Sequence, residues 1–417
     1  MTMHRRPLVV ALIATALVLT SALGPAPHAH AETTTLNGVS FTRGQSGCTG
    51  PLVGVYGASA LKAFILQAAQ DYCSAQRADG TPSTVAADVE YAPGGDSCPG
   101  DTYAASGSDG NEVGVSTVFP LSCANDGQPD VDPAQINDTR IGVNVVDEIA
   151  ACPGATEPNG GAVNPAGATP CGAFATDPAS ANAASCSPAD LSIAQAQLLY
   201  NQVIGNEQAV GGCNHSNAVQ NRVNGSGTRI TFCFNVYGAG TDNCQNEGSA
   251  QALAGTTGAE VNDVCGPSAA DTPYAQGYVS RAAVVADPRS PSNTPPLALQ
   301  GCGVVTLGGA SGYNGSCDPV DPSTFTPQNS QPNPGSGEIT CDDDLDVAAG
   351  RYSIWGYVHL VTNANAGGNN QSAQAFVTYA QNDEQALLQQ SGFLLPCQMN
   401  VRRTADGGPY TTTTATC

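Results

Sequence analysis

Charged side chains are unusually scarce in this chain. Asp, Glu, Lys and Arg make up 12% of its 417 residues, which is about half the usual share. Basic residues are the rarer kind, with 13 Lys and Arg against 35 Asp and Glu and a net charge of −22. So acidic a chain lacks the basic footprint that nucleic-acid binding needs. Because 41% of its residues are hydrophobic, the chain can build a core and is not a charge-rich disordered protein.

Histidine is also rare, and no two cysteines stand in C-x-x-C spacing. After residue 31 the remaining histidines are His215 and His359. Zinc ribbons and thioredoxin-like motifs need such ligands or spacing, so the sequence predicts neither. The 16 cysteines, an even number, instead indicate an oxidising compartment and up to eight disulfides, whose pairing the spacing leaves open.

Long hydrophobic runs are missing except at the N-terminus. Residues 1–31 combine a positive start, an apolar run over 8–23 and a small-x-small site at 29–31, which is the pattern of a Sec signal peptide. The alternative is a transmembrane anchor, but the run is short and a processing site follows it. We therefore expect a mature chain that starts near Glu32, spans no membrane and is secreted or periplasmic. No cysteine precedes Cys48, so we expect no lipid anchor.

Periodicity predicts strands that alternate with helices. Apolar residues at i, i+3, i+4 and i+7 predict a helix over 60–73 capped by Ser59, and Ser192 is a similar cap for a helix over 193–203. Residues 230–238 fit a helix or a strand equally. The other predicted elements are strands near 36–56 and at 85–91, 112–121, 140–150, 274–286 and 352–362, and a helix at 373–391. This order predicts α/β layers.

Two segments show no such periodicity. Residues 151–188 are rich in Ala, Pro, Gly and Asn and contain three cysteines, which predicts an insertion tied by disulfides. Residues 288–340 are rich in Pro, Ser, Asn and Gly, which predicts a long surface excursion. We interpret the many cysteines as staples for such insertions.

Three glycine-flanked turns carry small hydroxyl residues: Gly57-Ala58-Ser59, Gly95-Asp96-Ser97 and Gly225-Ser226-Gly227-Thr228. A helix N-terminus has unpaired backbone N–H groups and partial positive charge. Glycine lets an anion approach that backbone closely, and hydroxyls add uncharged donors. Arg222, four residues before Ser226 of the third turn, adds the planar charged fork that suits an oxyanion. Each turn alone is also typical of a helix cap or tight turn.

In this order, the turns and their surroundings resemble the phosphate-binding proteins of ABC transporters, which have the type II periplasmic-binding-protein fold. The segment NRVNGSGTRITF is similar to the family's R-x-D-G-S-G-T signature. The resemblance covers most of 50–280 and 345–405 and fails over the two segments without periodicity. It is carried by GASALKAFILQAAQDY (57–72), VEYAPGGDS (89–97), VGVSTVFPL (113–121), LSIAQAQLLYNQVIG and NRVNGSGTRITF (191–205, 221–232), and GYVS and RYSIWGYVHLVT (277–280, 351–362).

The resemblance implies an α/β, two-lobed fold with the ligand cleft between the lobes and disulfide-rich insertions. Lobe 1 would begin with residues 32–125, and lobe 2 would span 126–275 with the insertion 151–188. The chain would return to lobe 1 over 276–417, with the excursion 288–340.

The resemblance also implies a function. The chain would be an exported monomeric solute-binding protein, without enzyme activity, cofactor or metal, that captures phosphate or a similar oxyanion for an ABC permease. The ligand-binding residues carried over from the family are Gly57, Ala58, Ser59, Asp96, Ser97, Ser116, Thr117, Arg222, Ser226, Gly227 and Thr228.

The chain departs from the family at positions that matter for specificity. Thr117 and Asn224 stand where the family commonly has aspartates, Asp96 stands where it has a serine, and Ala60 replaces a large apolar residue. Monohydrogen phosphate carries a proton and needs an acceptor, whereas sulfate does not, so a carboxylate that faces the ligand selects phosphate. We hypothesise that Asp96 restores the acceptor that Thr117 cannot provide. The alternative is that Asp96 is a solvated turn residue.

Other functions stay open on the sequence. A disulfide-rich surface or adhesion protein could keep the scaffold and have a lost or altered ligand. A secreted hydrolase would need His215 or His359 in a triad, but no G-x-S-x-G elbow is present. Asp342, Asp344 and Asp346 have the spacing of a calcium loop, but the glycine and glutamate that such a loop requires are missing.

Overall fold

The structure is a computed structural model. Residues 1–31, nearly all of 151–188 and most of 288–340 lie outside the part that it describes, so the signal peptide and the insertions stay predictions. The described residues are 32–78, 86–92, 94–151, 190–205, 207–210, 219–238, 253–265, 276–283, 302–307, 347–348, 350 and 352–413.

The first part of the chain forms a parallel sheet from two strand–helix–strand units. β3 (Leu52–Gly57) pairs in parallel with both β4 (Asp88–Ala92) and β5 (Glu112–Ser116). α1 (Lys62–Ala78) connects β3 to β4, and α2 (Ser97–Ser106) connects β4 to β5. All three strands therefore end at one edge of the sheet, which is where open α/β sheets bind ligands.

The sheet continues with mostly antiparallel strands. β12 (Trp355–Asn363) pairs with β5 and with the 16-residue β6 (Ile136–Ala151). β6 also pairs with β10 (Gln276–Ser280) and β11 (Cys302–Leu307), and β7 (Asp190–Leu191) lies parallel to β11. The result is an eight-stranded mixed sheet in the order β4-β3-β5-β12-β6-β11-β7, with β10 on β6. β11 lies within 288–340, where the sequence predicts no strand, and its six residues belong to the sheet.

The remaining elements pack around this sheet or form short pairs. They are β1 (Thr33–Leu36), β2 (Val39–Thr42), the 3-10 turn η1 (Ser59–Leu61), α3 (Ile193–Tyr200), β8 (Asn221–Arg222), α4 (Gly227–Tyr237), β9 (Leu253–Ala254), α5 (Thr257–Cys265), the 3-10 turn η10 (Arg281–Ala283), α7 (Gln371–Asn382), α8 (Gln385–Gln390), β13 (Val401–Arg402) and β14 (Thr411–Thr412).

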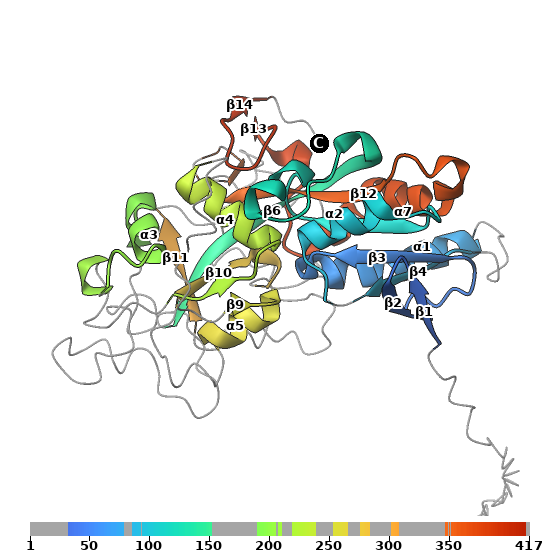
Figure 1. Cartoon of the computed structure of the whole chain (residues 1–417), viewed down its shortest axis with the longest axis horizontal. Helices are drawn as coiled ribbons and strands as arrows, with labels where there is room; N and C mark the ends of the chain where they lie inside the picture. Colours follow the sequence, from blue (N-terminus) through green and yellow to red (C-terminus); the bar gives the residue numbers. More distant parts are fainter. Residues whose placement is uncertain are drawn as a thin grey trace, which may run out of the picture.

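Two large apolar clusters divide the described core. The first packs α1, α7 and α8 on β3, β4 and β5, around Val55, Ile65 and Phe376. The second packs α3 and α4 on β6, β10 and β12, around Phe232 and Trp355. Figure 1 shows the two groups of elements side by side along the long axis, with β6 reaching from one toward the other. A ligand between them would contact both.

Two disulfides are described, and both lie in the first part of the chain. Cys48–Cys73 and Cys98–Cys123 each join residues 25 positions apart, and Cys233 and Cys397 are disulfide-bonded as well. These two bridges do not staple an insertion as expected. Cys48–Cys73 ties α1 to the segment before β3, and Cys98–Cys123 ties the start of α2 to the segment after β5, where it packs on α4.

Most predicted elements are confirmed where the chain is described. α1, β4, β6, α3 and β12 overlap the expected segments and are of the expected type. Ser192 caps α3 in a capping box with Gln195. Residues 227–237 are helical, which resolves the ambiguous segment. Among the described residues, no helix is long and apolar enough to cross a membrane.

Four predictions about individual elements needed correction. Ser59 does not cap α1, because the 3-10 turn η1 precedes that helix. Ser59 is the first residue of η1, and Ala58 is the N-cap of η1. The strand predicted over 112–121 ends at Ser116, and the one over 274–286 ends at Ser280, where η10 begins. The helix predicted over 373–391 is broken at 383–384. Asn382 and Asp383, where α7 ends, favour turns over continued helix.

Candidate functional site

The ends of β3, β4 and β5 meet the starts of α4 and α5 at a small pocket. α2 begins at Ser97, α4 at Gly227 and α5 at Thr257, and all three residues line this pocket. Each helix start provides backbone N–H groups and partial positive charge, so the three together favour a bound anion. The complete lining is Ala58, Ser59, Ala60, Asp96, Ser97, Thr117, Arg222, Ser226, Gly227, Thr228 and Thr257.

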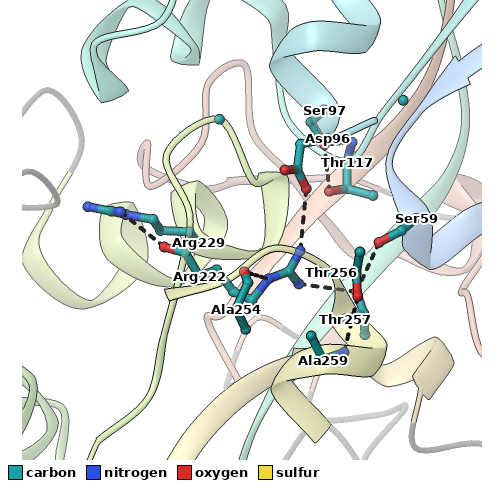
Figure 2. A network of polar contacts seen from close by, with 12 residues as sticks. Ser59, Asp96, Ser97, Thr117, Arg222, Arg229, Ala254, Thr256, Thr257 and Ala259 are labelled. Carbon is teal, nitrogen blue, oxygen red and sulfur yellow. Dashed lines mark hydrogen bonds and ion pairs between the residues drawn. The ribbon is translucent and has the colours of Figure 1, made fainter. Parts of the chain in front are cut away.

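Arg222 is the cation within the described lining of this pocket, and it is 1% exposed. Its Nε donates to the carbonyl oxygen of Ala254 (3.0 Å), and its Nη1 donates to Oγ1 of Thr257 (3.2 Å). Its Nη2 donates to Oδ1 of Asp96 at 3.3 Å. Figure 2 shows the guanidinium held between these three partners. A permanently charged group this deeply buried needs an opposite charge, and Asp96 provides it.

Asp96 is the N-cap residue of α2, yet its side chain does not cap the helix. The carboxyl turns to Arg222 instead. Burial raises the pKa of Asp96 to about 6, although the charge of Arg222 acts to lower it. The carboxylate is therefore ionised and accepts hydrogen bonds at neutral pH, and it gains a proton on mild acidification.

Two buried hydroxyls form the part of the pocket next to α2. The Oγ of Ser97 and Oγ1 of Thr117 lie 3.2 Å apart, and Ser97 Oγ also accepts from the backbone N–H of Thr117 at 3.0 Å. Gly227 packs directly on this pair, because a Cβ on Gly227 would lie 2.1 Å from Ser97 Oγ and 2.2 Å from Thr117 Oγ1. The glycine therefore lets the start of α4 approach the two hydroxyls.

A second arginine supports the backbone that carries Arg222. The Nη1 of Arg229 donates to the carbonyl oxygen of Arg222 (3.0 Å) and to Oδ1 of Asn224. The buried Asp126 accepts from the backbone N–H of Gly225 at 2.6 Å, and its other oxygen lies 3.7 Å from Arg229 Nε. This network fixes the turn between β8 and α4, and so fixes where Arg222 and Gly227 lie.

Nine of the eleven residues predicted for the site line the pocket, and two do not. Gly57 has φ +143°, and a Cβ there would lie 2.1 Å from the carbonyl oxygen of Val115. A glycine is therefore required at position 57 for the close packing of β3 on β5. Ser116 is fully buried, and its hydroxyl donates to the carbonyl oxygen of Val118 at 3.0 Å. Thr117 reaches the pocket and Ser116 does not, because the hydroxyl of Ser116, the last residue of β5, turns to Val118, whereas Thr117 lies just beyond the strand with its hydroxyl beside Ser97.

The sequence prediction missed two residues of the lining, Ala60 and Thr257. Ala60 entered the sequence comparison only as a departure from the family. Thr257 lies in Gly255-Thr256-Thr257-Gly258, which leads into α5. That is the same glycine-flanked hydroxyl turn before a helix that marked the other three segments, so the signal was present in the sequence.

One buried acid lies one turn further along α5. Glu260 is fully buried, and its Oε1 accepts from the backbone N–H of Tyr278 at 3.3 Å. Burial raises the pKa of Glu260 to about 8, while the positive charge of Arg222 acts to lower it. Arg222 therefore interacts with one carboxyl at the pocket and with a second behind it.

The residues that a hydrolase would need do not converge here. His359 is buried in β12, with its Nδ1 2.7 Å from Oδ1 of Asp138, and its ring packs on Phe119. This is the packed histidine of an apolar strand. His215 and the acidic run around Asp342 and Asp344 lie outside the described residues. Within the described ranges, no group of three His, Cys, Asp or Glu side chains is placed to hold a metal ion.

Comparisons with known proteins agree with the predicted fold. No protein-family model and no curated protein matches the sequence. Among solved structures, the chain is similar to a candidate phosphate ABC transporter substrate-binding protein from Clostridium perfringens with bound phosphate, with a TM-score of 0.51, 14% identity, and coverage of 82% of this chain and 99% of that chain. It is also similar to an ABC-type phosphate transport receptor from Vibrio cholerae, with a TM-score of 0.45, 12% identity, and coverage of 82% and 100%. The first likeness confirms the α/β substrate-binding-protein fold.

Proposed function

We propose that this chain is an exported solute-binding protein that captures inorganic phosphate in the pocket around Arg222. The observation that carries the proposal is the convergence of three helix starts, six hydroxyl side chains and one buried guanidinium on a single small pocket. Hydroxyls and oriented N–H groups bind an oxyanion at short range, while salt screens more distant charges over about 8–10 Å. The acidic net charge of the whole chain is therefore compatible with an anion ligand.

Phosphate is preferred over sulfate in this proposal because of Asp96. An ionised carboxylate in the lining accepts a hydrogen bond from the hydroxyl of monohydrogen phosphate, whereas it repels sulfate, which has no proton to donate. The support is that Asp96 lines the pocket beside Thr117, the position where the family commonly has its acid. The carboxyl is also within 3.3 Å of Arg222, so both can face one ligand.

The cleft between two lobes is part of the proposal. Ser59, Asp96 and Ser97 belong to the elements around the first apolar cluster, and Arg222 and Thr257 lie on β8 and α5 beyond it. We assign lobe 1 to 32–125 and 276–417, and lobe 2 to 126–275. Closure of the lobes would remove water from the anion and strengthen each polar contact.

Export rests on the signal sequence at 1–31, and transport on a partner. An exported phosphate-binding protein fits a periplasm or an extracellular scavenger. We propose that the monomer delivers phosphate to an ABC permease. Catalysis is not part of the proposal, since the described lining offers hydroxyls without a histidine to activate them.

The ion pair between Arg222 and Asp96 is the observation that favours a second function. It gives the arginine an internal partner where a ligand would bind, as expected of a surface or adhesion protein that retained the fold and lost the anion. Calorimetric titration of the mature chain with phosphate separates the two. We expect one phosphate per chain in the wild type and in the exposed control Arg402→Met, and none in Arg222→Met. Absence of binding to the wild type would favour the second function.

A further inference from the structure

Helix α5 contributes a hydroxyl from the far side of the pocket that none of the three sequence turns includes. Thr257 is 6% exposed and lines the pocket. Its Oγ1 lies 3.5 Å from Oγ of Ser59, a residue 198 positions earlier in the chain. Figure 2 shows Thr257 between Arg222 and Ser59. Thr257 is therefore placed to contact both a ligand and the opposite wall.

The hydrogen bonding at Thr257 sets the direction of its hydroxyl. Arg222 Nη1 donates to Thr257 Oγ1 at 3.2 Å, and a guanidinium has no acceptor to offer in return. The threonine oxygen must accept in this contact, so its own hydrogen is left to donate. The adjacent cation withdraws electron density from the hydroxyl and makes it a better donor.

The contact with Asp96 makes this donor more important. Nη2 of Arg222 faces the carboxyl of Asp96, so one arm of the guanidinium is already shared with an anion of the protein. The Nη1 arm is shared with Thr257 instead. A bound oxyanion on that side therefore meets the charge of Arg222 together with the threonine hydroxyl.

The neighbouring threonine has a different role and provides a matched comparison. Thr256 is exposed, and its Oγ1 accepts from the backbone N–H of Ala259 at 3.1 Å. This is a helix-capping contact. Thr256 does not belong to the pocket lining, whereas Thr257 does.

We propose that Thr257 is a ligand-binding residue whose hydroxyl donates to one oxygen of the captured oxyanion and links Arg222 to Ser59 across the cleft. This inference rests on the proposed function of the same pocket and extends its ligand shell to α5. A threonine that acted only through the arginine would instead be a positioning residue.

The test is calorimetric titration of the full mature chain with inorganic phosphate, for the wild type, Thr257→Val, Thr257→Ser and Thr256→Val. Valine keeps the shape of threonine and removes the hydroxyl. We expect Thr257→Val to weaken phosphate binding by about 10- to 100-fold, the effect of one hydrogen bond to a charged group. Thr257→Ser should restore most of the affinity. Thr256→Val should lower the melting temperature and leave the phosphate Kd unchanged.

A second titration separates direct contact from positioning. Arg222→Lys keeps a charge but loses the fork that contacts Thr257. With phosphate in large excess, we expect Thr257→Val to weaken binding in this background too. Wild-type affinity in Thr257→Val, or an effect that disappears in the Arg222→Lys background, would overturn the inference while leaving the proposed function intact. A wild-type chain that binds no phosphate would overturn both.

Discussion

Arg222 and Asp96 form an ion pair inside the pocket, with Nη2 of the arginine 3.3 Å from Oδ1 of the aspartate. The two residues come from β8 and from the N-cap of α2, 126 positions apart in the chain. The contact therefore joins the two groups of elements at the point where we propose that the anion binds. It also means that a carboxylate takes part in an anion site, which makes Asp96 the residue to change first.

Asp96→Asn should reduce the preference for phosphate over sulfate. The amide cannot provide the ionised acceptor that the phosphate proton needs, and it no longer repels sulfate. We expect weaker phosphate binding, stronger sulfate binding and a fall of about tenfold or more in their ratio. Competition titrations measure that ratio, with the exposed Asp130→Asn as control. An unchanged ratio would show that Asp96 is not the discriminating acceptor.

Gly227→Ala should disrupt the pocket. The added Cβ would meet Ser97 Oγ and Thr117 Oγ1 at 2.1 and 2.2 Å, so α4 or the two hydroxyls must move. We expect loss of phosphate binding and destabilisation by about 1–3 kcal/mol, measured by titration and by urea unfolding.

The matched control for that variant is Gly255→Ala. Gly255 lies before α5, and a Cβ there would have no heavy atom within 4 Å. The Gly255→Ala variant should bind phosphate with the affinity of the wild type. Equal binding by both variants would contradict the close approach of α4 to the hydroxyl pair.

The two described disulfides should have equal effects on stability and unequal effects on binding. Both close segments of 25 residues, so replacing either pair by alanine should cost about 3 kcal/mol of unfolding free energy. Cys98 follows the pocket residue Ser97, and its backbone N–H donates to the carbonyl oxygen of Gly225 at 3.1 Å, whereas neither Cys48 nor Cys73 adjoins a residue of the lining. Titration of the two double alanine variants should show weaker phosphate binding when Cys98 and Cys123 are replaced, and unchanged binding when Cys48 and Cys73 are replaced. Identical affinities would argue against a role of this bridge in the site.

Stability should increase as the pH falls from about 9 toward 5. Burial raises the pKa of Glu260 to about 8, and burial with the neighbouring Asp88 carboxyl raises the pKa of Glu90 to about 8. The unfolded chain protonates these groups only near about 4.3. Between pH values of about 4.3 and 8, the folded state therefore binds more protons than the unfolded state. The stabilisation that these two glutamates provide is complete below about pH 4.3 and is lost as the pH rises through 8.

Melting temperatures across this range measure the effect. Glu260→Gln should flatten the dependence and raise the melting temperature near pH 9, because it removes a buried carboxyl that ionises there. Glu32→Gln, at an exposed position, should follow the wild type. A wild-type curve that rises from pH 5 to pH 9 would contradict the raised pKa values.

The sequence was sufficient to predict the elements with clear periodicity and the pocket residues that lie together in one turn. α1 followed from apolar spacing and α3 from its Ser192 cap, and the three glycine-flanked turns supplied seven of the pocket residues. α4 was ambiguous because Ile230, Phe232 and Phe234 are all buried. A helix that is buried on every side shows no apolar stripe.

The rest depended on contacts between distant segments. Ser116 and Thr117 are equally good hydroxyls, and only the packing just beyond the end of β5 decides that Thr117 reaches the pocket beside Ser97. Thr257 enters through the packing of α5, and Asp96 meets Arg222 only when the two groups of elements come together. Cysteine spacing could not pair Cys48 with Cys73, because every pairing of the cysteines was open.

The most direct test of the account is calorimetric titration of the mature chain with phosphate and with sulfate at pH 5 to 9. We predict one phosphate site with a micromolar or lower Kd, and weaker sulfate binding that strengthens as the pH falls through about 6, where Asp96 gains its proton. Binding of neither anion, or sulfate binding equal to phosphate at pH 8, would contradict the claim that this pocket captures phosphate with Asp96 as its acceptor.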